Sequence, residues 1–348
     1  FGLDHGGFKQ DWEADLTRNL VLKAGLDLGA ARGRWEYSGW VVFRTVDEES
    51  RFIPDLNSRT MDAREGGTRV GGYLAARAQS FGMLTSELVV RFDRESHTGE
   101  THFSPRILLR WDPESRTSLK GGIGRYVQAQ AVHELRVPDG ETRYGEAEIA
   151  DQVAVGVERV LGRGVRGRLE LYLREVDRPS SLFLNLTREV TPLPELESDR
   201  VEVVPSRLRN RGIELILSRE ESGPWSWSMS YAFSRAEGRF AEGWAPLPFD
   251  QPHTINLHAR YRRNRAWTFS GSWQYQSGWP YTERHPRLVE GQGLVPGEVW
   301  TLTDQRFGTF NGMRLPPYHR LDLRATRTFL VGKGSLEVYL DIFNAYGR

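Results

Sequence analysis

Hydrophobic and polar residues alternate along most of this chain with a period of two. In residues 225–234 every odd position is aromatic or methionine, whereas every even position is serine or alanine. The same alternation appears in residues 253–262, where Ile255 and Leu257 oppose Thr254 and Asn256. A period of two indicates β-strands whose two faces meet different surroundings. A helix would mix the two sets of side chains on every face.

Repeating this test along the chain predicts about 14 strands, most of them close to the length that a tilted strand needs to cross a bilayer, about 9 to 11 residues. The expected strands are 8–17, 20–30, 69–78, 82–92, 104–111, 117–128, 151–161, 165–175, 209–219, 225–235, 253–263, 266–277, 318–330 and 335–345.

The connections between these strands alternate between short turns and long segments. Connections such as 18–19, 162–164 and 263–265 fit hairpin turns. Between them lie long segments, of which the first is expected to carry a hairpin of its own at 34–44. The long segments are 31–68, 93–103, 129–150, 176–208, 236–252 and 278–317. Outer-membrane barrels have this asymmetry, with short turns on the periplasmic side and long loops outside.

Whether the apolar face of the strands meets lipid or a packed core can be decided only from the whole set of strands. A soluble β-sandwich is the more common home for any single alternating strand, but it needs only about 7 to 9 strands joined by short loops. A barrel of about 14 strands or more encloses a lumen too wide for side chains to fill, so charged residues can point inward and stay hydrated. The pattern therefore favours an all-β transmembrane barrel with apolar residues outside and polar residues inside.

Composition agrees with this interpretation once the alternation is taken into account. The 348 residues carry 47 Lys and Arg against 46 Asp and Glu, a net charge of +1, and the hydrophobic fraction is only 39%. A mean hydropathy of −0.53 is that of a polar protein, yet alternating barrel strands also average low. No apolar run is long enough for a spanning helix, and residues 1–10 hold no secretion signal. The absence of an initial Met and the stop after a strand-like run indicate a piece of a longer precursor.

Several patterns associated with catalysis or cofactors occur without their context. Residues 162–167 match G-x-G-x-x-G, but the following segment alternates as a strand instead of opening a helix, which indicates a glycine turn. Asp250 and His253 lack a nucleophile motif. Glu195 and Glu197 lie in a proline-containing segment that predicts a solvated loop.

Metal, cofactor and nucleic-acid sites are not indicated either. With no Cys and no ligand spacing among the 8 His, the chain predicts no metal site, no cofactor and no enzyme. Basic residues are spread over alternate strand positions instead of one stripe, which argues against nucleic acid as a partner.

Several stretches of the sequence resemble a known protein family. The stretches RGIEL at 211–215, FDQPH at 249–253, QSGWPYT at 276–282, RLPPYHRLDLR at 314–324 and LDIFN at 340–344 are similar to the barrel of TonB-dependent outer-membrane receptors. The segments FSPR at 103–106 and GRYVQ at 124–128 fit as well, and the similarity runs in order from about 69 to 345.

The resemblance implies a specific architecture. Members of this family are barrels of about 22 strands closed around an N-terminal plug. Residues 1–348 would then form a partial barrel domain, without the plug, its energy-coupling segment or the last strand. An open barrel would leave edge strands that need partners.

The resemblance also implies a function in the bacterial outer membrane. The expected function is energy-coupled uptake of a scarce nutrient, such as a ferric siderophore, a cobalamin or an oligosaccharide. The implied partners are outer-membrane lipid, a TonB-type energy-coupling protein acting through the missing N-terminal region, a small-molecule ligand, and a lipoprotein or other subunit that supplies missing strands or a lid. Aromatic residues of the outer loops are the candidate ligand contacts, unless each simply packs on its own loop: Trp244, Trp279, Tyr281, Trp300 and Phe307.

Two alternatives remain open at the level of sequence. A passive porin would share the location but lack a plug of about 100 residues or more before this segment. A soluble all-β carbohydrate-binding module or enzyme would bury the apolar face between stacked layers. Trp227, Tyr231, Leu257 and Leu323 would then lie in a dry centre.

Overall fold

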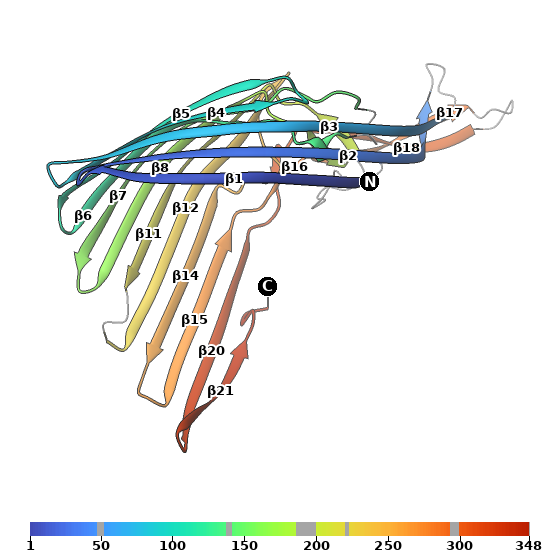
Figure 1. The fold of residues 1–348 in the computed structure, drawn as a ribbon. Coiled ribbons are helices and arrows are strands. Elements are labelled where there is room, and N and C mark those ends of the chain that lie inside the picture. Colours follow the sequence, from blue (N-terminus) through green and yellow to red (C-terminus); the bar gives the residue numbers. More distant parts are fainter. Residues whose placement is uncertain (47–51, 137–140, 186–199, 220–222, 293–298, 348) are drawn as a thin grey trace.

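The computed structural model describes all residues except 47–51, 137–140, 186–199, 220–222, 293–298 and 348. Its main feature is one continuous antiparallel sheet that bends into a trough (Figure 1). Strands follow one another in the sheet in chain order, so each is hydrogen-bonded to the strands before and after it in the sheet path. No helix among the described residues is long and apolar enough to span a membrane.

The strands of the sheet path are β1 (Gly2–Thr17), β2 (Leu20–Val46), β3 (Phe52–Ser80), β4 (Leu84–Glu95), β5 (Thr101–Glu114), β6 (Thr117–Gln128), β7 (Glu148–Gly162), β8 (Val165–Asp177), β11 (Arg207–Arg219), β12 (Trp225–Phe240), β14 (His253–Arg262), β15 (Trp267–Gln276), β20 (Tyr318–Val331) and β21 (Gly334–Ile342). A short strand, β13 (Gly243–Pro246), pairs with the end of β12. The predicted all-β, up-and-down topology is confirmed.

The connections alternate between a turn end and a loop end of the sheet, as the sequence predicts. At the turn end, β7 and β8 are joined through Gly162, Arg163 and Gly164, which all have positive φ angles of 106°, 52° and 76°. Glycine adopts such angles without steric cost, which is why this motif makes a tight hairpin turn. The G-x-G-x-x-G match is therefore a turn between two strands.

The loop end carries the remaining small elements. They are a 3₁₀ helix η1 (Val132–Glu134) and three two-stranded ribbons: β9 (Leu182–Asn185) with β10 (Arg200–Val203), β16 (Pro280–Tyr281) with β19 (Met313–Arg314), and β17 (Arg284–Gln292) with β18 (Val299–Phe307). The expected paired carboxylates Glu195 and Glu197 lie outside the described residues.

The prediction of a long loop at 31–68 with a separate hairpin at 34–44 is wrong. Strands β2 and β3 run through it as one long hairpin, in unbroken register from Leu20 opposite Ala78 to Val46 opposite Phe52. The alternation at 34–44 is real, because Trp35 and Tyr37 of the extension pack with Val132 and Leu135. A period of two identifies a strand but not its partner, so the pattern alone does not show that this segment continues β2 and pairs with β3.

The cross-strand register places the alternating faces consistently across the sheet. Leu257 lies opposite Met229 on one side and Trp273 on the other, so apolar residues meet apolar residues on one face. That face stays open: Leu257 is 37% exposed and Leu323 is 42% exposed. Trp227 and Tyr231 on the same face are half-buried.

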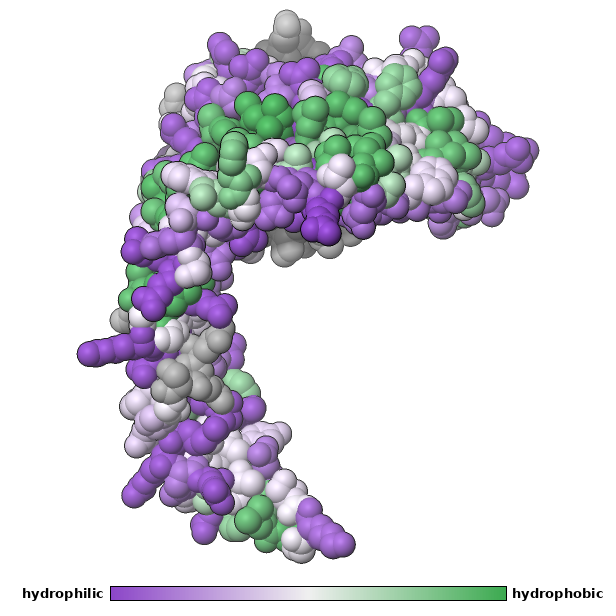
Figure 2. Space-filling model, turned by 60° about the vertical axis from the view of Figure 1, so that its left-hand side comes forward, coloured by the Kyte–Doolittle hydropathy of each residue, from purple (hydrophilic) through white to green (hydrophobic). Residues whose placement is uncertain are grey.

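No second layer covers the apolar face in the part of the chain that the structure describes, and only seven hydrophobic residues are buried anywhere in that part. Figure 2 shows the resulting bent wall, with hydrophobic side chains gathered in patches between hydrophilic ones. A soluble sandwich would have to bury this face, so the stacked-layer alternative does not describe this fold.

Candidate functional site

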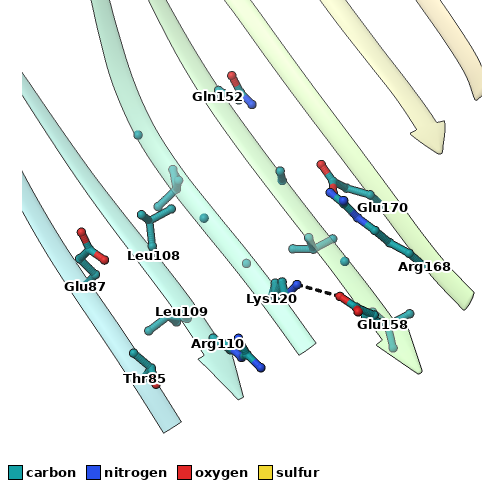
Figure 3. A pocket seen from close by; sticks show the side chains of 18 of the residues that line it. Thr85, Glu87, Leu108, Leu109, Arg110, Lys120, Gln152, Glu158, Arg168 and Glu170 are labelled. Atoms are coloured by element: carbon teal, nitrogen blue, oxygen red, sulfur yellow. Dashed lines mark hydrogen bonds and ion pairs between the residues drawn. The ribbon is translucent and has the colours of Figure 1, made fainter. Parts of the chain in front are cut away.

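The inner face of the sheet contains a hollow where β6 and β7 lack large side chains. Gly122 and Gly124 of β6 point to the same face as Ala154 and Gly156 of β7, because Gly122 pairs with Ala154. Together with the neighbouring side chains they leave a hollow of about 410 Å³ (Figure 3). A Cβ atom at Gly122 would lie 2.8 Å from Leu108 Cδ2, so a side chain at this position would push the Leu108 side chain aside and fill part of the hollow.

Charged side chains form the rim of this hollow. Lys120 Nζ lies 2.9 Å from a carboxylate oxygen of Glu158, an ion pair between β6 and β7 that Figure 3 marks. Arg168 pairs with Glu170 on β8. Arg110 Nε lies 2.9 Å from Asp112 on β5. Positive and negative groups are balanced, so the rim is a hydrated polar wall and not a trap for one sign of charge.

A second charged network lies on the inner face nearer the loop end. Arg69 of β3 approaches Asp27 at 3.8 Å and Glu95 at 3.3 Å. Arg91 of β4 lies 2.6 Å from Asp93 and 3.6 Å from the same Asp27. Bridges between three neighbouring strands hold the polar side chains in fixed positions along the wall. The two networks give the inner face polar, charge-balanced groups along its length.

The connection between β6 and β7 folds onto the inner face of the extended β2–β3 hairpin. Val132 and Leu135, each 4% exposed, pack against Trp35 of β2. The Tyr144 hydroxyl donates to the Val132 carbonyl oxygen at 3.2 Å, and burial raises the pKa of Tyr144 to about 12. The ring of Tyr144 also meets His97 edge to face at 4.7 Å. This loop therefore forms an apolar cap on the inner side of the loop end.

A polar cluster ties together two other long loops. Asp250 is 1% exposed, accepts a hydrogen bond from the Ala236 amide at 2.7 Å and pairs with the Arg314 guanidinium. Arg314 Nη1 also donates to the Asp250 carbonyl oxygen at 2.7 Å. Asn311 Nδ2 donates to the Pro246 carbonyl oxygen at 2.8 Å. The loop after β12 and the long connection before β20 are thus joined by buried, satisfied polar groups.

The structure places the predicted aromatic contacts in different parts of the loop end. Trp244 lies on β13, with the Arg209 guanidinium 4.5 Å from its ring centroid. Trp279 meets Phe249 edge to face at 6.0 Å, and Tyr281 is the second residue of β16, which begins at the next position, Pro280.

The other two predicted contacts belong to the β17–β18 ribbon. Phe307, 44% exposed, lies at the end of β18 opposite Arg284. Trp300 is in β18, and its side chain lies outside the described residues. Trp279 and Tyr281 are two residues apart at β16, whereas Trp244 lies on β13 beside Arg209. The role of all five in ligand binding stays a prediction.

Sequence reasoning missed the glycine hollow and the Asp250–Arg314 pair. The hollow has a signal in the sequence: glycines at alternate positions of a predicted strand, Gly122 and Gly124, leave one face empty. The pair has none, because Asp250 and Arg314 are 64 residues apart and no periodicity links them.

Comparison with known families supports the resemblance seen in the sequence. The family model described as TonB dependent receptor-like, beta-barrel, matches residues 3–345. A search of curated protein sequences finds no match.

Solved structures with the same fold are outer-membrane receptors and transporters. The ferric enterobactin receptor PfeA of Pseudomonas aeruginosa, as a mutant, superposes with a TM-score of 0.64 at 14% identity, covering 99% of this chain and 48% of the receptor. The copper transporter OprC has a TM-score of 0.64 at 15% identity, covering 99% and 51%. The outer membrane transporter YddB of Escherichia coli has a TM-score of 0.62 at 13% identity, covering 98% and 50%.

These similarities settle the family and the location. The chain spans about half the length of the solved structures it matches. At these identities the structural likeness shows the fold, while the family model covers nearly the whole chain. Family and structural relatives are receptors and transporters of the bacterial outer membrane, not enzymes. The chain belongs to the TonB-dependent receptor family, as part of its outer-membrane β-barrel.

Proposed function

We propose that this chain forms part of the barrel of a receptor for energy-coupled uptake of a scarce nutrient. The observation that carries the proposal is that one bent sheet has an apolar outward face and a charged inner face. One face is apolar and open, as lipid requires, and the other holds charge-balanced networks around a hollow of about 410 Å³. Such an inner wall offers a wet path for a polar solute.

Each part of the structure has a role in this proposal. The outer loops capture the ligand through aromatic contacts, for which the candidates are Trp244, Trp279, Tyr281, Trp300 and Phe307. A plug inside the barrel rearranges when a TonB-type protein pulls on it from the periplasm. The edge strands β1 and β21 each pair on one side only among the described residues. Unpaired edges are costly in lipid, so further strands of the same polypeptide or another subunit complete the wall.

The class of nutrient is a ferric siderophore, a cobalamin or an oligosaccharide. Among the structural relatives, PfeA is a ferric enterobactin receptor and FrpB of Neisseria meningitidis is an iron transporter. These names favour a ferric chelate as the first candidate to assay. The balanced inner wall fits a ligand recognised by the outer loops more than by the lumen.

The test is uptake by the full-length precursor in cells that express an energy-coupling protein. Ferric siderophores, cobalamin and an oligosaccharide are supplied in turn as labelled ligands. Ala154→Trp places a large ring in the inner hollow and is expected to reduce uptake without abolishing surface binding of the ligand. Val155→Trp puts the same ring on the apolar face of the same strand and serves as the matched control.

Passive leakage decides between this proposal and a porin. The receptor is expected to leave vesicles closed to unrelated small solutes and to transport only when the inner membrane is energised. Release of unrelated solutes from liposomes without energy would assign the protein to the porins.

A further inference from the structure

The outward face of the sheet changes abruptly from apolar to charged on β11 and β12. On β11 the outward positions Ile213, Leu215 and Leu217 are apolar, whereas Arg207, Arg209 and Arg211 follow on the same face toward the loop end. On β12 the apolar set ends at Phe233 and is followed by Arg235, Glu237 and Arg239. Because the apolar positions face lipid, this boundary lies where the hydrocarbon gives way to lipid headgroups.

The register at this boundary opposes like charges. Arg207 lies directly opposite Arg239, and Arg211 lies directly opposite Arg235. Like charges at opposed positions of an antiparallel pair destabilise it. A ladder with two such pairs on one face needs anions to offset the repulsion.

Carboxylates of the protein supply only part of that compensation. Arg207 lies 2.8 Å from Asp177, Arg209 lies 2.8 Å from Glu175, and Arg211 lies 3.4 Å from Glu237. Five arginines therefore face three carboxylates, which leaves an excess of two positive charges. Arg235 and Arg239 have no ion-pair partner among the residues that the structure describes. Trp244 covers Arg209 with its ring at 4.5 Å and further holds that guanidinium in place.

An apolar groove lies on the same outward face, on the turn-end side of the arginines. It has a volume of about 410 Å³, and six of its lining residues are Trp227, Met229, Leu257, Ala259, Gly271 and Trp273. The small residues Ala259 and Gly271 are opposed in register, which creates the depression between larger neighbours. Met229 and Arg235 are six residues apart on β12, a distance of about 20 Å along the strand. An acyl chain whose headgroup lies at the arginines is long enough to reach the groove over this distance.

We propose that this outward face binds a phosphorylated membrane lipid, with its phosphates on the arginines and an acyl chain in the groove. The two Arg–Arg rows are four residues apart along each strand, about 13 Å. A headgroup with two phosphates therefore meets both rows at once. Arginine is the residue best suited to this contact, since its planar guanidinium donates two hydrogen bonds to a phosphate.

The test measures binding of bis-phosphorylated hexa-acyl lipid A to the purified full-length receptor in neutral detergent, by native mass spectrometry. The double variant Arg235→Gln, Arg239→Gln is expected to bind about 25-fold more weakly, about fivefold for each arginine lost. Arg174→Gln on β8 is the matched control. Arg174 pairs with Asn210, so it lies at the level of the patch but points to the inner face, and this variant is expected to keep wild-type lipid affinity.

A stability measurement separates binding from a structural role. In lipid-free detergent the double variant is expected to unfold at the same temperature as wild type or higher, because the substitution removes like-charge repulsion. If it unfolds earlier, the arginines support the fold and the proposal fails. Should the double variant not fold, Arg239→Gln alone changes an exposed side chain and is expected to weaken binding about fivefold.

Three further comparisons test the acyl-chain groove, the number of phosphates and the need for a lipid. Ala259→Trp fills the groove and is expected to weaken lipid binding, whereas Asn256→Trp on the inner face leaves it unchanged. Monophosphorylated lipid A is expected to bind more weakly than the bis-phosphorylated form. Inorganic phosphate that binds as tightly as the lipid, or equal affinity for both lipids, would overturn the proposal.

Discussion

The wall of the barrel and its loop end are stabilised in different ways. Along the wall, strands are held by backbone pairing, and most large apolar side chains stay open to lipid, such as Val155 at 51% exposed and Leu171 at 42%. At the loop end the chain behaves like a small soluble protein: Val132, Leu135 and Trp35 form a buried cluster, and Asp250 is almost fully covered. The lipid replaces the core in the first region, whereas the second must build its own.

This difference predicts which single substitutions lower the stability of the protein most. In the wall the cost depends on the face that a side chain occupies. At the loop end it depends on whether a buried partner is left unsatisfied. The following predictions test that contrast, from the largest expected effect to the smallest.

The largest effect is expected at the buried ion pair of the loop end. Asp250→Ala leaves the Arg314 guanidinium and the Ala236 amide without their carboxylate partner. Breaking a buried pair costs about 3–5 kcal/mol. Thermal unfolding and protease cleavage in the loops after β12 and before β20 measure this loss.

An exposed pair in the wall provides the control for that experiment. Lys120 and Glu158 have side-chain exposures of 47% and 42%. Glu158→Ala is therefore expected to cost about 0–1 kcal/mol. Equal losses from the two substitutions would contradict the distinction between wall and loop end.

The next effect depends on the face of one wall strand. Leu257→Arg puts a charge on the outward face of β14, which costs about 2–4 kcal/mol near the middle of the bilayer. Asn256→Arg adds the same charge to the inner face of the same strand, where water receives it, and is expected to change stability little. Urea unfolding of the full-length protein in lipid vesicles compares the two, and a larger loss at Asn256 would reverse the assigned faces.

The smallest effect concerns the pH at which the apolar cap opens. Burial raises the pKa of Tyr144 from its ordinary 10.0 to about 12. A raised pKa means that the folded loop prefers the neutral phenol, so the stabilisation is complete below pH 10 and is lost as the pH rises toward 12. Amide protection factors of residues 129–136 and 141–147, that is, exchange rates corrected for base catalysis, are expected to fall over this interval.

Tyr144→Phe tests the origin of that pH step. The variant loses the hydrogen bond to the Val132 carbonyl oxygen, at a cost of about 0.5–1.5 kcal/mol, but has no phenol to ionise. Its loop is expected to open at the same rate at pH 9 and pH 11. A step that persists in the variant would assign the transition to another group.

The same contrast explains what the sequence predicts and what it does not. Alternation identifies every strand of the wall, because each residue of 225–234 or 253–262 reports directly on lipid or water. The pattern does not give the partner of each strand: residues 34–44 alternate, but only the structure shows that they continue β2 and pair with β3.

Loop contacts are the least predictable part of the molecule. The cap joins Trp35 to Val132, and the polar cluster joins Asp250 to Arg314, across segments with no common period. Aromatic residues can be named as loop contacts, but their composition does not say that Trp244 lies beside Arg209 while Trp279 packs on Phe249.

The most direct test of the whole account is the environment of consecutive side chains on β14. The 348-residue chain contains no Cys, so single cysteines at positions 254–259 can carry a spin label each. In lipid vesicles, labels at 255, 257 and 259 are expected to be accessible to oxygen dissolved in the bilayer, and labels at 254, 256 and 258 to a water-soluble relaxation agent. Accessibility without this alternation, or with the two sets exchanged, would contradict the assignment of an outward apolar face and an inner aqueous wall.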